Sequence, residues 1–179
     1  QGPIATTLEN KRVSFVAIDD APAGKNVYPW DLSKTEFDAY LAAHPAEKAA
    51  LTHERSVVRR ADKPTLLRDL GTLKRYPVLD TLHPGLRARL ERLSRKPDRK
   101  LLYAAPYSVA FADEMIRAHA LMNEAADAVE GDDWAFAKYL RNRSRDLRID
   151  DYESGDAAWL KGRFKNLNAP IGADESFDY

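Results

Sequence analysis

The chain has 179 residues, and its 28 basic and 28 acidic side chains give a formal net charge of zero at pH 7. This balance provides no electrostatic basis for nucleic acid or an anionic membrane as partner, and no run of eighteen apolar residues predicts a membrane span. The absence of cysteine excludes disulfides and thiolate zinc sites, and it suits the bacterial cytoplasm and periplasm equally, so the compartment stays unknown.

The first predicted elements are a strand and a helix. Residues 12–18 alternate and are rich in β-branched side chains, which predicts a short strand near the N-terminus. A loop is expected over residues 23–30. Ser33 and Glu36 have the spacing of a capping box and predict a helix that ends near His44. Its buried face is expected to hold Phe37, Tyr40 and Leu41.

Two further helices are predicted before residue 100. Asp62 is a suitable N-cap for a helix that ends at Tyr76, before a proline. A second helix lies between Pro84 and Pro97. Their apolar positions are Leu66, Leu67, Leu70 and Leu73 in the first, and Leu86, Leu90 and Leu93 in the second. Residues 76–85 and 95–108 are interpreted as connections within one domain.

The strongest periodicity lies between residues 111 and 129, where apolar side chains recur in steps of four and three. This spacing predicts a long helix that ends at Gly131. The positions concerned are Phe111, Met115, Ala118, Met122, Ala125 and Val129. Another helix follows Trp134, a short one includes residues 157–160, and residues 164–171 are expected to be extended. The prediction is one mostly α domain over residues 1–179, with minor β near the N-terminus and at the C-terminal end.

No catalytic constellation is evident from the residues alone. The histidines are His44, His53, His83 and His119, and none has a second histidine at the spacing of a zinc pair. No serine lies in a nucleophile elbow, and glycine-rich phosphate loops are absent. We therefore expect neither a metal site nor a catalytic residue in this chain.

Acidic side chains gather near residue 151, beside Tyr152. They are Asp150, Asp151, Glu153 and Asp156. Capping of a helix N-terminus explains such a cluster, because acids favour the positive end of the helix dipole. The alternative is an enzyme that binds a hard cation such as Mg²⁺ around Asp151.

The last residues suggest a strand that carries chemistry. In an extended chain alternate side chains share a face, so Glu175 and Phe177 would point the same way. A strand edge beside a cleft can pair with an extended peptide, and a carboxylate there can bind the free amine of that peptide.

Several motifs, in order, resemble the dipeptidyl peptidase III-type zinc peptidases, over roughly residues 24 to 179. They lie at residues 24–29, 57–60, 102–111, 136–143, 150–159 and 169–177. In that family the last segment ends in an Ile-Gly-x-x-Glu-Thr-Tyr strand. The resemblance implies a helical lobe that faces a zinc lobe across a wide cleft. It also implies release of dipeptides from peptide N-termini by zinc-activated water.

Position by position, the resemblance makes Glu175 the carboxylate that holds the substrate amine, with Gly172 in the same substrate-binding motif. Phe177 stands where the family has a tyrosine, and without a hydroxyl it loses a donor worth roughly 3 kcal/mol in the transition state. Tyr179, on the same strand face, is the expected substitute.

The zinc-binding His-Glu-x-x-Gly-His helix has no counterpart in this sequence. The resemblance thus implies the N-terminal, substrate-side lobe of a larger two-lobed peptidase. Its expected partners are a peptide substrate and the zinc-binding C-terminal portion of the same protein, which would hold the Zn²⁺. The alternative is a stand-alone helical peptide-binding or interaction module without catalysis.

Overall fold

The computed structural model describes residues 27–167, 169, 171 and 172. Within this part the chain forms α-helices and one two-stranded sheet, which confirms a mostly α fold with minor β. The strand predicted over residues 12–18 lies outside the described residues, as do Glu175, Phe177 and Tyr179 of the predicted C-terminal strand. The described residues between 164 and 172 belong to no strand. None of the described helices has the length and hydropathy of a membrane span.

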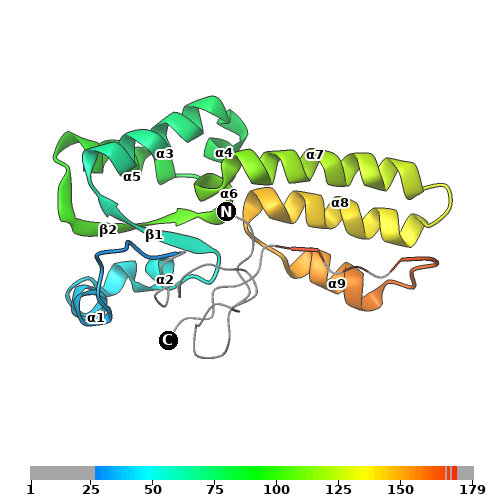
Figure 1. The fold of residues 1–179 in the computed structure, drawn as a ribbon, viewed down its shortest axis with the longest axis horizontal. Coiled ribbons are helices and arrows are strands. Elements are labelled where there is room, and N and C mark those ends of the chain that lie inside the picture. The colour runs from blue at the N-terminus through cyan, green and yellow to red at the C-terminus, as the bar shows by residue number, and fades with distance from the viewer. Residues whose placement is uncertain (1–26, 168, 170, 173–179) are drawn as a thin grey trace, which may run out of the picture.

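In chain order the elements are α1 Lys34–Ala43, the 3₁₀ helix η2 Pro45–Glu47, α2 Lys48–Leu51, β1 Ser56–Ala61, α3 Lys63–Arg75, α4 Pro77–Leu82, α5 Leu86–Arg95, β2 Asp98–Pro106, α6 Tyr107–Ala110, α7 Ala112–Val129, α8 Trp134–Ile149 and α9 Glu153–Lys161. Figure 1 shows two halves. In one, the sheet lies between α3 and α5 on one face and α1 and α2 on the other. The second half consists of α7 and α8 side by side, with α9 along α8.

The helix starts follow the local signals in the sequence. Ser33 Oγ accepts a hydrogen bond from the Glu36 amide at 3.1 Å, and Asp62 Oδ1 accepts one from the Thr65 amide at 2.9 Å. The reciprocal half of the predicted capping box does not form. Instead, the Glu36 carboxylate binds Arg60 of β1 at 3.0 and 3.1 Å.

The sheet is antiparallel, with Ser56 opposite Pro106 and Arg60 opposite Leu102. The interpretation of residues 95–108 as a connection was wrong, because they contain β2. The physical reason is burial on both faces: Leu102 belongs to the core cluster with α1 and α2, whereas Tyr103 belongs to the cluster with α3 and α5. Such a strand shows no alternation of polar and apolar residues. Residues 76–85 likewise contain α4, which begins at Pro77.

The first strand carries two adjacent arginines that bond to opposite layers. Arg59 pairs with the buried Asp69 of α3, which also accepts a hydrogen bond of 2.7 Å from the Tyr103 hydroxyl. Arg60 pairs with Glu36 of α1. Successive side chains of a strand point to opposite faces, so each guanidinium reaches a different helix layer.

The predicted long helix is α7, and it packs against α8 (Figure 1). Met115 and Met122 are buried as expected, but Ala126 is buried in place of Ala125. The helix α8 lies between α7 and α9, so its buried residues cover a wide band, about half of the helix circumference at 100° per residue. These are Phe136, Ala137, Tyr139, Leu140, Arg143, Ser144, Asp146 and Leu147.

Candidate functional site

The predicted substrate-binding residues fall at the limit of the described chain. Glu175, Phe177 and Tyr179 lie outside the described residues. Gly172 is described, and it is exposed in a bend after Ile171. The structure therefore shows how the chain is held where the predicted motif begins.

A buried tyrosine of α8 holds the backbone at Ile171. The Ile171 amide donates a hydrogen bond to the Tyr139 hydroxyl at 2.8 Å, a normal length for this type. The Tyr139 hydroxyl in turn faces the Ile171 carbonyl oxygen at 3.5 Å. Tyr139 has no exposed surface, and its ring packs on Phe136 and Phe164. Because packing fixes the phenol, the hydrogen bond holds the segment that follows α9 against α8 at Ile171.

Next to this contact, a second buried tyrosine lies among cations. The guanidinium carbon of Arg55 is 4.2 Å from the centre of the Tyr152 ring, and that of Arg143 is 5.0 Å from it. At these distances the ring quadrupole attracts both charges. Burial disfavours the charged form of Arg143, but hydrogen bonds with Asp156 and Tyr139 outweigh this effect and raise its pKa.

Gly172 lies against Tyr152 and Arg143. A Cβ atom at this position would lie 3.6 Å from the Tyr152 ring and 3.9 Å from Arg143 Nη1, which are ordinary van der Waals distances. The described surroundings thus leave room for a methyl group at residue 172. We define Tyr139, Arg143 and Tyr152 as the α8 anchor. No local pattern in the sequence predicts it, because its contacts join residues 32 apart.

The acidic cluster near residue 151 is dispersed in space. Asp150 accepts hydrogen bonds from Ser108, Asp151 accepts one from the Glu153 amide at 3.2 Å, and Asp156 pairs with Arg143. Within residues 27–172, as far as they are described, no group of three or more side chains is arranged to hold a metal ion. Glu153 and Asp156 lie in the first turn of α9, as the helix dipole favours, but the N-cap residue is Tyr152 and its side chain forms no capping hydrogen bond.

Asp150 belongs to a buried polar trio that no local sequence pattern predicts. Its Oδ2 atom accepts a hydrogen bond of 2.6 Å from Ser108 Oγ, which lies 2.7 Å from His83 Nε2. Burial raises the pKa of Asp150 to about 6, although the hydrogen bonds from Ser108 act to lower it. Burial lowers the pKa of His83. Ser108 has no exposed surface and donates to the carboxylate. The trio therefore joins α6 to the ends of α4 and α8 and is not a nucleophile site.

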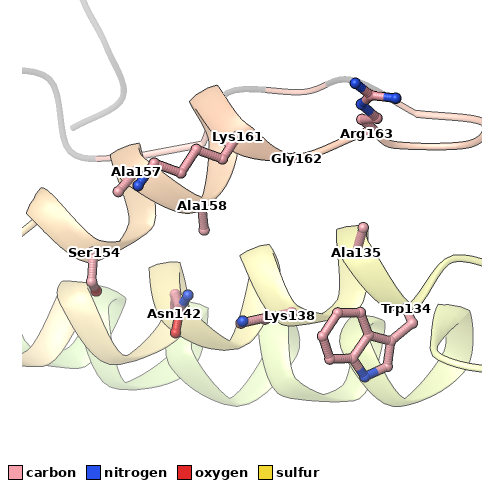
Figure 2. A pocket seen from close by; sticks show the side chains of 10 residues that line it. All are labelled: Trp134, Ala135, Lys138, Asn142, Ser154, Ala157, Ala158, Lys161, Gly162 and Arg163. Atoms are coloured by element: carbon pink, nitrogen blue, oxygen red, sulfur yellow. The ribbon is translucent and has the colours of Figure 1, made fainter.

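A groove of about 430 Å³ runs between α8 and α9. Figure 2 shows Trp134, Lys138 and Asn142 along the α8 wall, with Ala158 and Lys161 on the facing helix. It is separate from the α8 anchor, because none of the anchor residues lines it.

Comparison with known proteins gives one informative likeness. No protein-family model matches the chain. No curated protein sequence matches it. Among solved structures, the structure of DPP III from Caldithrix abyssi matches with a TM-score of 0.58 and 26% identity over 90% of this chain. The chain spans 23% of that protein's length, and its fold is DPP III-like.

Proposed function

We propose that this chain is the substrate-binding portion of a zinc-dependent, DPP III-like hydrolase that removes dipeptides from peptide N-termini. The observation that carries the proposal is the likeness to a DPP III structure over 90% of the chain. The motifs that resemble this family also occur in order along the sequence. Two independent properties, fold and motif order, thus point to the same class of protein.

In this proposal the zinc ion is bound by the C-terminal portion of the same protein. The described residues offer no suitable set of metal ligands, so no step assigned to this chain passes through the metal. The zinc supplies an activated water when bound. This chain supplies the binding and orientation of the peptide.

Within this chain, Glu175 is proposed to hold the free amine of the substrate, and Phe177 and Tyr179 to line the same strand face. The α8 anchor supports this assignment. It fixes the backbone at Ile171 through a hydrogen bond of 2.8 Å to Tyr139 and packs Gly172 against Tyr152. A substrate-binding motif that begins at a fixed point loses less conformational entropy when a peptide binds.

The test is the Glu175→Gln variant of the protein that contains this chain, assayed on matched peptides with free and acetylated N-termini. Loss of the ion pair with the substrate amine is expected to lower kcat/KM for the free peptide about 100-fold, or roughly 3 kcal/mol. Asp174→Asn is the matched control, because it removes the same charge one residue away. It is expected to leave both activities nearly unchanged.

Equal losses on free and acetylated peptides, or equal effects of the two variants, would remove Glu175 from the amine site. A protein that binds these peptides but releases no dipeptide would instead identify the stand-alone binding module.

A further inference from the structure

The groove between α8 and α9 carries charge that the described part of the protein does not neutralise. Lys138, Lys161 and Arg163 line it, and all of them are at least partly exposed. None of the three forms an ion pair with another described residue. No aspartate or glutamate lines the groove.

Two acids that precede groove residues in the sequence by one or two positions form ion pairs with cations that do not line the groove. Asp156 of α9 pairs with Arg143, and Asp132 pairs with Lys165 at 2.6 Å. Ser154, at one end of the groove, donates its hydroxyl to Asp146 at 3.1 Å. The helix dipole accounts for a cation at Lys161, in the last turn of α9, but not for Lys138 in the interior of α8.

The floor of the groove is apolar and is formed by small side chains. Small residues from both walls line it: Ala135, Ala157, Ala158 and Gly162. Trp134 closes one end with 62% of its surface exposed, and Lys138 Nζ lies 5.3 Å from the centre of its ring. Figure 2 shows this indole on the α8 side near Lys138, with Ala157, Ala158 and Gly162 on the facing segment. An exposed tryptophan beside an open apolar floor is typical of the centre of a binding surface.

We propose that this groove binds an acidic peptide segment of a partner protein. Carboxylates of the segment pair with Lys138, Lys161 and Arg163, while an aliphatic side chain lies on the alanine floor against Trp134. Charge complementarity selects the partner, because the charged side chains among the described groove residues are all positive and flank a narrow apolar strip. The proposal rests on the groove alone and is independent of the proposed peptidase function.

The probe is a short blocked peptide of alternating glutamate and leucine, with a twin in which glutamine replaces every glutamate. Binding to the full chain is measured by calorimetry at low and high salt. The acidic peptide is expected to bind and its twin to bind at least about tenfold more weakly, because only the acidic peptide can form the ion pairs. Added salt should weaken the acidic complex.

The variant Lys138→Gln with Lys161→Gln removes two of the groove charges. It is expected to weaken the acidic peptide about tenfold. The matched control is Lys74→Gln with Lys100→Gln, which makes the same charge change at exposed positions of α3 and β2. This control should bind like the unmodified chain. In addition, Trp134→Phe should abolish any change in tryptophan emission on binding.

Some results would overturn the proposal. These are equal binding of the acidic peptide and its twin, equal effects of the two double variants, or no binding at all. Association with vesicles of phosphatidylserine and phosphatidylcholine, lost in the groove variant, without peptide binding would assign the cations to a lipid surface instead.

Discussion

Gly155, in the first turn of α9, touches the most buried ion pair of the α8–α9 contact. Its amide donates a hydrogen bond to Asp146 Oδ2 at 3.0 Å. A Cβ atom at this position would clash with the same carboxylate and approach the Arg143 guanidinium carbon at 3.0 Å. Asp146 has no exposed surface, so it has little room to move away. Only glycine fits here without displacing a buried charge.

The Gly155→Ala variant is therefore expected to lower the free energy of unfolding by about 1–3 kcal/mol, as is usual for an overpacked site. Gly71→Ala is the matched control. Gly71 lies inside α3, and a Cβ atom added there would meet no other atom within 4 Å. Alanine there should stabilise the protein by about 0.5–1 kcal/mol. Urea denaturation of both variants checks the prediction, and a stabilised Gly155→Ala variant would contradict it.

Among the elements, α8 holds the segment that follows α9 through the hydroxyl of Tyr139. Tyr139→Phe keeps the ring contacts with Phe136 and Phe164 but removes the acceptor of the Ile171 amide proton. We expect the free energy of unfolding to fall by about 1 kcal/mol and hydrogen exchange at Ile171 to accelerate about fivefold.

Exchange measured by NMR checks this result at one amide. Tyr40→Phe serves as the control, because its hydroxyl contacts involve Glu47 and Leu102 rather than residue 171 and are long, at 3.4 Å. Unchanged exchange at Ile171 in the Tyr139 variant would mean that the phenol does not fix the segment.

The longer helices were predictable from sequence because their start signals are local, whereas the short helices α4 and α6 were missed. Ser33 and Asp62 each cap a helix within three residues of their own position. The sheet was missed because both faces of β2 are buried, which only the whole fold determines. Long-range contacts also explain the smaller differences. Arg60 takes the Glu36 carboxylate away from the capping box, and Trp134 stays exposed although it begins an apolar stretch.

The candidate site was less predictable than the fold. Glu175 was predicted from the family resemblance, since an acid in an extended segment is common by itself. The α8 anchor joins Tyr139 to Ile171 across 32 positions, and no periodic pattern encodes such a contact. Likewise, the positive charge of the groove stands out only when the partners of every neighbouring acid in the described chain are known.

At the scale of the whole molecule, the buried trio of Asp150, Ser108 and His83 makes stability depend on pH. Burial raises the pKa of Asp150 from 3.8 to about 6, so the folded state keeps a proton that the unfolded state releases in this window. The Asp150 contribution is thus present below pH 4 and is lost as the pH rises towards 6, by up to about 3 kcal/mol. Burial lowers the pKa of His83, so the contribution of His83 to stability has the opposite pH dependence: it is lost as the pH falls below the usual pKa of histidine.

Comparison with Asp150→Asn isolates the carboxyl group. Asparagine keeps an acceptor for the Ser108 amide and tolerates the left-handed backbone of residue 150, where φ is 57°. We expect the difference in unfolding free energy between the variant and the parent to change in favour of the variant as the pH rises from 4 to 6. A difference that is constant with pH would contradict the raised pKa.

The adjacent arginines of β1 also help to specify the register in which β1 pairs with β2. A slip of β1 by one residue would exchange the faces of Arg59 and Arg60, so that each guanidinium would point towards the other's layer. The slip would break the observed pairs of Arg59 with Asp69, which is 1% exposed, and of Arg60 with Glu36. It would also turn Val57 and Val58 away from the separate core clusters in which each is buried. The observed register is thereby favoured over a one-residue slip on both faces of the strand.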